Sequence, residues 1–191
     1  MDTIVPLTLR LNSEDRPALL AHFLSLDAED RRLRFGASIA DIVVREYVAR
    51  LQFGRDGLFA VRDVHGRVIA AVHVAITEGS AELGLSVDPK HRSRGNGGAL
   101  FARAVDFLRN RGIREVFVHC LAENAAMRHL AVRHGMRLSS QGSESEGRMT
   151  LLPATPESHF REWLHDQQAA ALTILRRNGQ LARVLWTLSR Q

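Results

Sequence analysis

The stretch Ser86–Gly112, SVDPKHRSRGNGGALFARAVDFLRNRG, joins the end of an apolar run to an amphipathic helix. The helix is predicted from about Asn96 to Arg111, because apolar residues recur on one face and Gly112 is placed to end it. These apolar residues are Leu100, Phe101, Ala104, Val105 and Leu108. A bare, basic loop therefore stands at the N-terminus of a helix.

Such a loop is suited to binding an anion. The first N–H groups of a helix lack intrahelical partners and form the positive end of the helix dipole. Gly95, Gly97 and Gly98 remove Cβ atoms that would hold a ligand away, while Arg92 and Arg94 add positive charge. Together they predict a diphosphate cradle, and the alternative is a glycine-rich turn that only joins a strand to a helix.

Two familiar phosphate-binding motifs do not match this loop. A P-loop has Lys-Ser/Thr after its last glycine, whereas Ala99 and Leu100 follow Gly98. A dinucleotide fingerprint reads G-x-G-x-x-G, whereas this loop reads G-x-G-G-A-L. The loop belongs to neither class.

The chain around the loop predicts strands. LFAVRD (58–63), RVIAAVHVAIT (67–77) and AELGLSV (81–87) are rich in aliphatic residues and are separated by turn residues, which indicates three consecutive antiparallel strands. After the helix, REVFVHCL (114–121) predicts another strand and NAAMRHLAVRHG (124–135) another helix. We expect MRLSSQ and GRMTLL to close a hairpin across a GSESE loop (142–146).

The N-terminal part predicts a strand and helices. VPLTLRLN (5–12) alternates apolar and polar residues, as in a strand. Ser13 is the expected cap of a helix over 14–26, and 27–38 is a charged connection that holds at most a short helix. Ser38, with Asp41 three residues later, is the expected cap of a helix over 39–51.

The character of the chain changes near residue 152. Thr155 and Pro156 are typical of a helix start, and "RNG" then separates two apolar stripes. The first stripe comprises Phe160, Trp163, Leu164, Ala171, Leu172 and Leu175, and the second comprises Leu181, Val184, Leu185 and Leu188. We expect a domain over 1–152 and a helical extension over 153–191 that packs on the domain or forms a homodimer.

Composition restricts the class of protein. The 191 residues are 45% hydrophobic and 25% charged, which is typical of a globular domain. No apolar run approaches the roughly 18 residues of a membrane span, and no leader pattern is seen, so we expect no membrane association. Cys120 is the only cysteine, which favours a cytoplasmic location and predicts a small core residue.

The charged and histidine residues indicate neither nucleic acid nor metal. The formal net charge is +5, but Lys90 is the only lysine among 26 basic residues and the arginines are scattered. We therefore expect no nucleic-acid partner. The nine histidines show no pairing typical of a metal site, so we expect no metal.

The run VDPKHRSRGNGGAL (87–100) resembles the central signature of the GNAT superfamily of N-acetyltransferases. Arg92 to Gly97 match its Arg/Gln-x-x-Gly-x-Gly/Ala loop, which in that family holds the pyrophosphate of acetyl-CoA. Asn124, Leu130, Gly135 and Met136 match the helix that follows. The resemblance covers about four-fifths of the chain and implies an α/β (α+β) fold: a mixed, mostly antiparallel sheet flanked by helices.

The resemblance also implies a chemistry. Two adjacent parallel strands would splay to admit acetyl-CoA, the co-substrate, and its acetyl group would pass to an amine without a covalent enzyme intermediate. Leu85 and Val87 are the candidates for backbone contacts to the pantetheine arm, and an N–H near Val87 is the candidate oxyanion donor. The resemblance assigns the cofactor loop to Arg92, Arg94, Gly95, Asn96, Gly97 and Gly98, with Asn124 as a further contact.

A base must deprotonate the amine, because an alkylammonium with a pKa near 10.4 is about 99.9% protonated at pH 7. Glu82 is the candidate base, and pairing with a neighbouring arginine is its alternative role. The family pattern places a tyrosine acid seven residues after the helix asparagine, where this chain has Ala131; Tyr47 is the only tyrosine. That departure leaves open a non-catalytic acyl-CoA-binding regulatory module. The sequence does not specify the acceptor.

Overall fold

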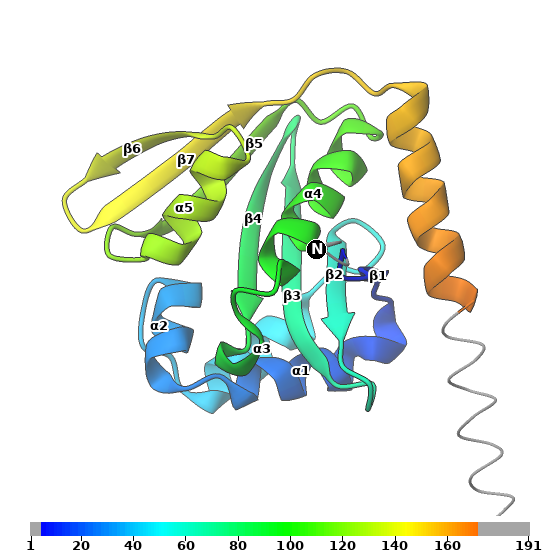
Figure 1. The fold of residues 1–191 in the computed structure, drawn as a ribbon. Helices are drawn as coiled ribbons and strands as arrows, with labels where there is room; N and C mark the ends of the chain where they lie inside the picture. The colour runs from blue at the N-terminus through cyan, green and yellow to red at the C-terminus, as the bar shows by residue number, and fades with distance from the viewer. Residues whose placement is uncertain (1–4, 172–191) are drawn as a thin grey trace, which may run out of the picture.

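Strand β2 (Gly57–Arg62) shows how the sequence pattern builds the sheet. Its side chains alternate between two apolar clusters: Leu58 and Ala60 belong to one, Phe59 and Val61 to the other. The computed structural model describes residues 5–171, in which β2 is part of a seven-stranded sheet with helices on both faces (Figure 1). The predicted α/β class is confirmed.

The elements follow the predicted order. The other strands are β1 (Leu9–Arg10), β3 (Val68–Thr77), β4 (Ser80–Val87), β5 (Glu115–Leu121), β6 (Arg137–Gln141) and β7 (Glu144–Thr150). The helices are η1 (Ser13–Asp15), α1 (Arg16–Ser25), α2 (Ala28–Phe35), α3 (Asp41–Arg50), η2 (Pro89–His91), α4 (Asn96–Arg109) and α5 (Ala125–Arg133), and residues 156–171 are also helical. Leu172, Leu175 and the second predicted stripe lie outside the described residues.

The sheet is mixed and mostly antiparallel, as predicted. Its strand order is β1-β2-β3-β4-β5-β7-β6, and among the strands within residues 5–171 only the β4–β5 pair is parallel. Helices α1 and α3 cover one face through residues such as Phe23 and Val44. Helices α4 and α5 cover the other face through residues such as Phe101 and Met127.

The parallel pair separates soon after it begins. Only Ser80, Ala81 and Glu82 pair with β5, opposite Glu115 to Phe117. Beyond that point β4 continues to Val87 against β3 alone, and Figure 1 shows β4 and β5 diverging. The predicted splay is confirmed, and it leaves backbone polar groups on the facing edges without ladder partners.

The N-terminal predictions need correction. The expected strand over 5–12 is shorter and comprises Leu9–Arg10, because Pro6 has no N–H for a ladder. Pro6 instead lies beside Gly95, with its Cδ 3.8 Å from the position that a Cβ on Gly95 would occupy. Asn12, and not Ser13, caps the first helical turn in a capping box with Asp15.

Two other local predictions were wrong. Ser38 caps nothing, because α3 starts later, after Ala40, without a side-chain cap. The expected GSESE loop is a connection of two residues at Gly142, whose φ is 59°, and residues 144–146 belong to β7. That shorter turn places Ser145 in the sheet, where it is buried.

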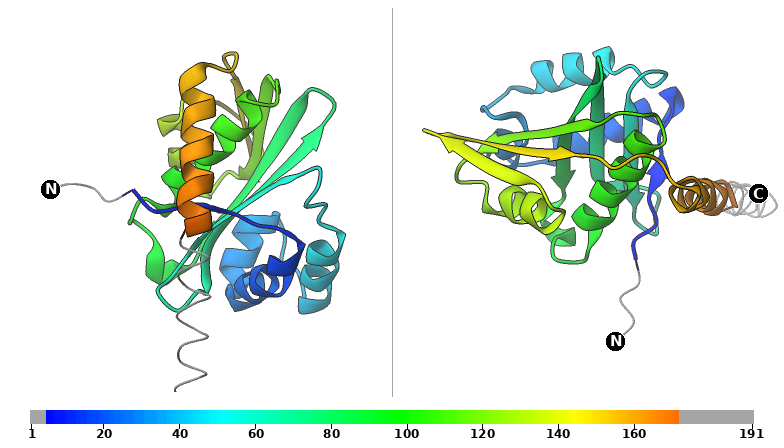
Figure 2. Two further views of the ribbon diagram at one scale, coloured as in Figure 1. Left: turned by 90° about the vertical axis from the view of Figure 1, so that its right-hand side faces the viewer. Right: turned by 90° about the horizontal axis from the view of Figure 1, so that it is seen from above.

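The helix over residues 156–171 lies alongside α4 (Figure 2) and is held there by polar contacts. Arg161 makes two hydrogen bonds to Asp106, and Arg103 pairs with Asp166. Phe160 and Trp163 stack on each other but remain 59% and 54% exposed. The described part of the extension thus contacts the domain through polar side chains, and its apolar stripe stays exposed.

His22 on α1 gives the fold a testable pH dependence. It is buried, with Nε2 2.8 Å from the Ser86 hydroxyl and Nδ1 3.2 Å from the Val68 carbonyl oxygen, and burial lowers its pKa from 6.5 to about 4. Between those values the unfolded chain binds a proton that the folded chain does not. We expect the contribution of neutral His22 to the free energy of unfolding to be complete above pH 6.5. As the pH falls to 4, the free energy of unfolding should decrease by about 3 kcal/mol through this residue.

Urea unfolding of the wild type and His22→Gln at pH 7.5, 6 and 5 measures this contribution. We expect the free energy of unfolding to fall less steeply with decreasing pH in the variant, and exposed His65→Gln to follow the wild type. Burial also lowers the pKa of His73, so the comparison uses the difference between variants. Parallel curves for the wild type and His22→Gln would contradict the assignment.

Candidate functional site

The loop before α4 has a fixed conformation. Ser93 and Gly95 are left-handed, with φ of 57° and 78°, and Gly95 caps the helix. The Asn96 side chain is buried and donates a hydrogen bond of 2.8 Å to the His91 carbonyl, which ties the loop back on itself. The N–H groups of Asn96, Gly97 and Gly98 lack intrahelical acceptors and remain free for a ligand.

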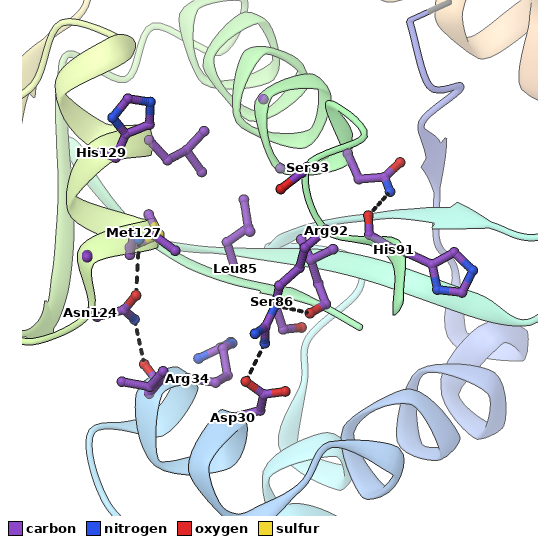
Figure 3. A pocket seen from close by; sticks show the side chains of 18 of the residues that line it. Asp30, Arg34, Leu85, Ser86, His91, Arg92, Ser93, Asn124, Met127 and His129 are labelled. Atoms are coloured by element: carbon purple, nitrogen blue, oxygen red, sulfur yellow. Dashed lines mark hydrogen bonds and ion pairs between the residues drawn. The ribbon is translucent and has the colours of Figure 1, made fainter. Parts of the chain in front are cut away.

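These residues line a cavity of about 580 Å³, which we call the loop cavity (Figure 3). Its walls come from the end of β4, the loop before α4, the start of α5 and one side of α2. Of the predicted cofactor residues it includes Leu85, Val87, Arg92, Gly95, Asn96, Gly97, Gly98 and Asn124. The fold thus brings together residues that are 39 positions apart in the chain.

Two glycines keep the loop cavity open. A Cβ on Gly97 would contact Leu130 Cδ2 at 3.5 Å and Leu85 Cδ2 at 3.8 Å, and one on Gly98 would lie 3.7 Å from His134 Nε2. These are ordinary contact distances, so glycine is not required for the backbone there. The absence of side chains instead leaves the amides of the first turn accessible.

The two loop arginines differ. Arg92 forms an ion pair with the buried Asp30 of α2, and its Nε donates to the Val87 carbonyl oxygen at 3.3 Å. Arg94 is exposed and does not line the loop cavity. Arg92 therefore brings α2 to the loop as well as carrying charge, which the sequence did not indicate.

Asn124 uses both ends of its side-chain amide. Its Oδ1 accepts a hydrogen bond of 3.0 Å from the Met127 N–H and caps α5, while its Nδ2 donates to the Leu33 carbonyl oxygen at 3.2 Å (Figure 3). These bonds join α5 to α2 across the divergence of β4 and β5. Asn124 thus caps α5 as well as lining the loop cavity.

A second cavity of about 330 Å³, the Glu82 cavity, opens between β4 and β5. Its polar lining includes Glu82, His119 and Glu144. The two cavities share Leu33, Arg34, Leu85, Asn124 and Met127. A ligand lying along β4 from the loop would therefore reach Glu82.

Glu82 is the last residue of β4 that pairs with β5. Its carboxylate is half-exposed and lies 3.2 Å from His119 Nδ1, and His119 Nε2 lies 3.4 Å from the Glu146 carboxylate. The predicted arginine partner is not seen among the ion pairs of the described residues. The carboxylate is open to the Glu82 cavity and has a second titratable group beside it.

Arg34 was missed by the sequence analysis. It comes from the end of α2, lines both cavities, and lies over Gly84, where a Cβ would be 2.6 Å from the guanidinium carbon. A lone glycine inside a strand often marks such a close approach, and Gly84 in AELGLSV is that signal. Nothing in the charged segment over 27–38 distinguished Arg34 from its neighbours.

Cys120 and the potential metal ligands were the other groups considered in the sequence. Cys120 is buried as predicted, and burial raises the pKa of its thiol, which keeps it protonated. Within residues 5–171 no three His, Cys, Asp or Glu side chains gather as metal ligands would. In the same residues, no helix combines the length and the apolar character that crossing a bilayer requires.

Comparison with known proteins agrees with the geometry. The family model "Acetyltransferase (GNAT) family" matches residues 24–136. A mycothiol acetyltransferase of Clavibacter michiganensis subsp. michiganensis (strain NCPPB 382) is 32% identical over 115 residues, which are 60% of this chain and 36% of that protein. The chain thus spans about a third of this relative's length.

Solved structures share the fold. The GNAT domain of S. lividans PAT superposes with a TM-score of 0.64 at 21% identity, covering 75% of this chain and 89% of that one. A GNAT superfamily phosphinothricin acetyltransferase from Sinorhizobium meliloti, solved in complex with AcCoA, gives 0.63 at 11% identity, covering 80% and 91%. At these identities the likeness establishes the fold.

Proposed function

Because this chain belongs to the acetyltransferase (GNAT) family, we propose that it moves an acetyl group from acetyl-CoA to a primary amine by direct attack. The observation that carries the proposal is the end of β4–β5 pairing at Glu82. It joins the loop cavity to the Glu82 cavity along one strand edge. One ligand can then span from the α4 amides to a carboxylate.

The loop fits the pyrophosphate of acetyl-CoA. The N–H groups of Asn96, Gly97 and Gly98 provide unpaired donors at the positive end of α4. Arg92 supplies a guanidinium at the rim, but its ion pair with Asp30 reduces the charge it offers. Binding therefore depends mainly on the backbone amides, with Gly95 fixing their direction.

The free edge of β4 fits the pantetheine arm. Leu85 lies in both cavities and Val87 in the loop cavity, so their backbone groups are the proposed contacts. Val87 is five residues from Glu82, about 16 Å along a strand, too far for both to act on one thioester. We therefore place the oxyanion donor closer to Glu82, at the N–H of Leu85, which points away from β3.

Glu82 is the proposed base. It removes a proton from the ammonium of the acceptor, directly or through water, and the amine nitrogen then attacks the thioester carbonyl carbon. The C–N bond forms as the C–S bond breaks, the thiolate of CoA takes up a proton, and one further proton reaches solvent. His119, 3.2 Å from Glu82, can pass that proton outward.

The chain supplies no tyrosine where the family pattern has its acid. Ala131 at that position is fully buried against Gly147, and its Cβ lies 3.6 Å from the position that a Cβ on Gly147 would occupy. A thiolate with a pKa near 8.5 is a tolerable leaving group, so water can protonate it. The same observation favours the second candidate, an acyl-CoA-binding regulatory module without turnover.

Thiol release from acetyl-CoA tests the proposal. The wild type is incubated with acetyl-CoA and a panel of amino acids, polyamines, peptides with free N-termini, and lysine peptides. Acetyl-CoA binding with acceptor-dependent thiol release supports the transferase. Binding without release from any amine supports the regulatory module, and absence of acetyl-CoA binding contradicts both.

We also propose that residues 153–191 form an extension whose apolar face packs against a second copy. Its polar face already contacts α4, which leaves Phe160, Trp163 and Leu164 exposed. Sedimentation equilibrium should show a dimer that Trp163→Arg weakens about 10- to 100-fold, given the area that a tryptophan buries. Exposed Gln167→Arg is the control; a wild type that stays monomeric at high concentration contradicts the proposal.

A further inference from the structure

Arg34 occupies a position that the reaction described above does not use. Its guanidinium lies over Gly84 of β4, at the junction of the loop cavity and the Glu82 cavity. Any side chain on Gly84 would collide with it, because even a Cβ would be 2.7 Å from Nη1. The strand is therefore shaped to admit this cation beside the candidate base.

A chain of hydrogen bonds holds Arg34 in place. Its Nη2 donates to the Tyr47 hydroxyl at 2.9 Å, the hydroxyl lies 2.8 Å from His73 Nδ1, and His73 Nε2 lies 3.1 Å from the Asp56 carboxylate. Burial lowers the pKa of His73, so its ring is neutral near pH 7. Neutral His73 accepts from Tyr47 and donates to Asp56, which leaves the hydroxyl oxygen free to accept from Arg34.

Aromatic rings surround the guanidinium. Its carbon lies 4.8 Å from the centre of the Phe35 ring and 5.6 Å from the centres of the Phe23 and Tyr47 rings. These cation–π contacts restrain the side chain. The arginine is thus oriented before any ligand arrives.

Arg34 nevertheless lacks an anion. In the part of the chain that the structure describes, no carboxylate forms an ion pair with it, and its Nε is buried without a hydrogen-bond partner. Glu82, on the same strand face, is paired with His119 instead. A half-buried cation without a counter-ion costs free energy, which an anionic ligand in the adjoining cavity would recover.

The proposed pose of acetyl-CoA places its diphosphate away from Gly84, although Arg34 also lines the loop cavity. Gly84 precedes Val87 by three residues, about 10 Å along the strand, and the α4 amides lie beyond Val87. In that pose the acceptor is left to supply the anion at Arg34. Glu82 and Gly84 are two residues apart on one face of β4, about 7 Å. The Glu82 carboxylate, which can bind a cation, and the Arg34 guanidinium over Gly84, which can bind an anion, therefore lie at the two ends of a short stretch of the strand.

We propose that Arg34 binds the carboxylate of the acceptor, and that the acceptor is a free α-amino acid. Its ammonium group lies at Glu82 and its carboxylate at Arg34, with the side chain in the Glu82 cavity. This inference rests on the proposed function, because it names the substrate class of the same site. Tyr47 and His73 are positioning residues that hold Arg34.

Matched acceptors test the assignment. The twenty common amino acids are screened with acetyl-CoA, and the best acceptor is compared with its carboxamide and its decarboxylated amine. We expect the wild type to favour the acid about 10- to 100-fold in kcat/KM, the range that a charge-assisted hydrogen-bonded contact supplies. Arg34→Gln should remove this preference through KM, while Arg45→Gln, an exposed arginine of α3, should keep it.

Binding provides a readout that does not need turnover. The N-acetylated amino acid and its N-acetylated carboxamide are titrated calorimetrically into the wild type saturated with CoA. Tighter binding of the acid, lost in Arg34→Gln and weakened in Tyr47→Phe, supports the proposal. Tyr47→Phe keeps the ring, so it serves if Arg34→Gln does not fold.

The outcomes separate this proposal from the proposed function. Equal binding of acid and carboxamide by the wild type overturns the role of Arg34 even when acetyl transfer to amines is observed. A preference for the acid that persists in folded Arg34→Gln overturns it as well. Absence of acetyl-CoA binding overturns the proposed function, and in that case the acid and carboxamide titrated without CoA still test Arg34.

Discussion

Glu82→Gln is expected to lower kcat/KM for acetyl transfer by about 10²- to 10⁴-fold, the usual contribution of a general base. The variant keeps the size of the side chain but cannot take a proton from an ammonium group. Acetyl-CoA affinity should stay unchanged, because the loop cavity does not include Glu82. Steady-state kinetics and calorimetric titration of acetyl-CoA measure the two quantities.

If Glu82 had a structural role instead, Glu82→Gln would lower the free energy of unfolding, and we do not expect this. Its contact with His119 joins two half-exposed side chains, and such pairs contribute about 0–1 kcal/mol. Glu82→Gln should therefore unfold at the same urea concentration as the wild type. Glu78→Gln, in the exposed turn before β4, is the matched control and should retain activity. Activity near wild type in Glu82→Gln would remove Glu82 from the mechanism.

The sheet and the loop were accessible from sequence because their signals are local. β-Branched runs predicted β2 to β5, and the glycines after β4 predicted the loop and helix start beside which the loop cavity lies. Gly112 and Gly135 end α4 and α5 with φ of 71° and 84°, as their positions in the sequence indicated. Each of these features depends on neighbours within a few residues.

Long-range contacts explain what the sequence did not indicate. Asp30 and Arg92 are distant in sequence and pair only because α2 packs across the end of β4. The alignment of Arg34, Tyr47 and His73 draws on α2, α3 and β3, and no spacing rule joins those segments. The polar attachment of residues 156–171 to α4 was hidden for the same reason, because the apolar stripe was the only local signal.

Gly97→Arg is expected to weaken acetyl-CoA binding at least about 100-fold, because it blocks two or more charge-assisted hydrogen bonds to the first-turn amides of α4. The position tolerates a Cβ, whose nearest neighbour would be Leu130 Cδ2 at 3.5 Å, so the variant should fold. The longer arginine side chain then fills the loop cavity between β4 and α5. Calorimetric titration of acetyl-CoA into both proteins measures the loss.

The added charge makes this substitution a demanding test. An extra guanidinium attracts phosphate, so a loss of affinity can arise only from steric occlusion of the amides. Gly54→Arg adds the same charge at an exposed glycine with no atom within 4 Å of its Cβ position and should bind like the wild type. Gly97→Ala should show a smaller loss. Equal affinity of Gly97→Arg and Gly54→Arg would mean that acetyl-CoA does not bind through the first turn of α4.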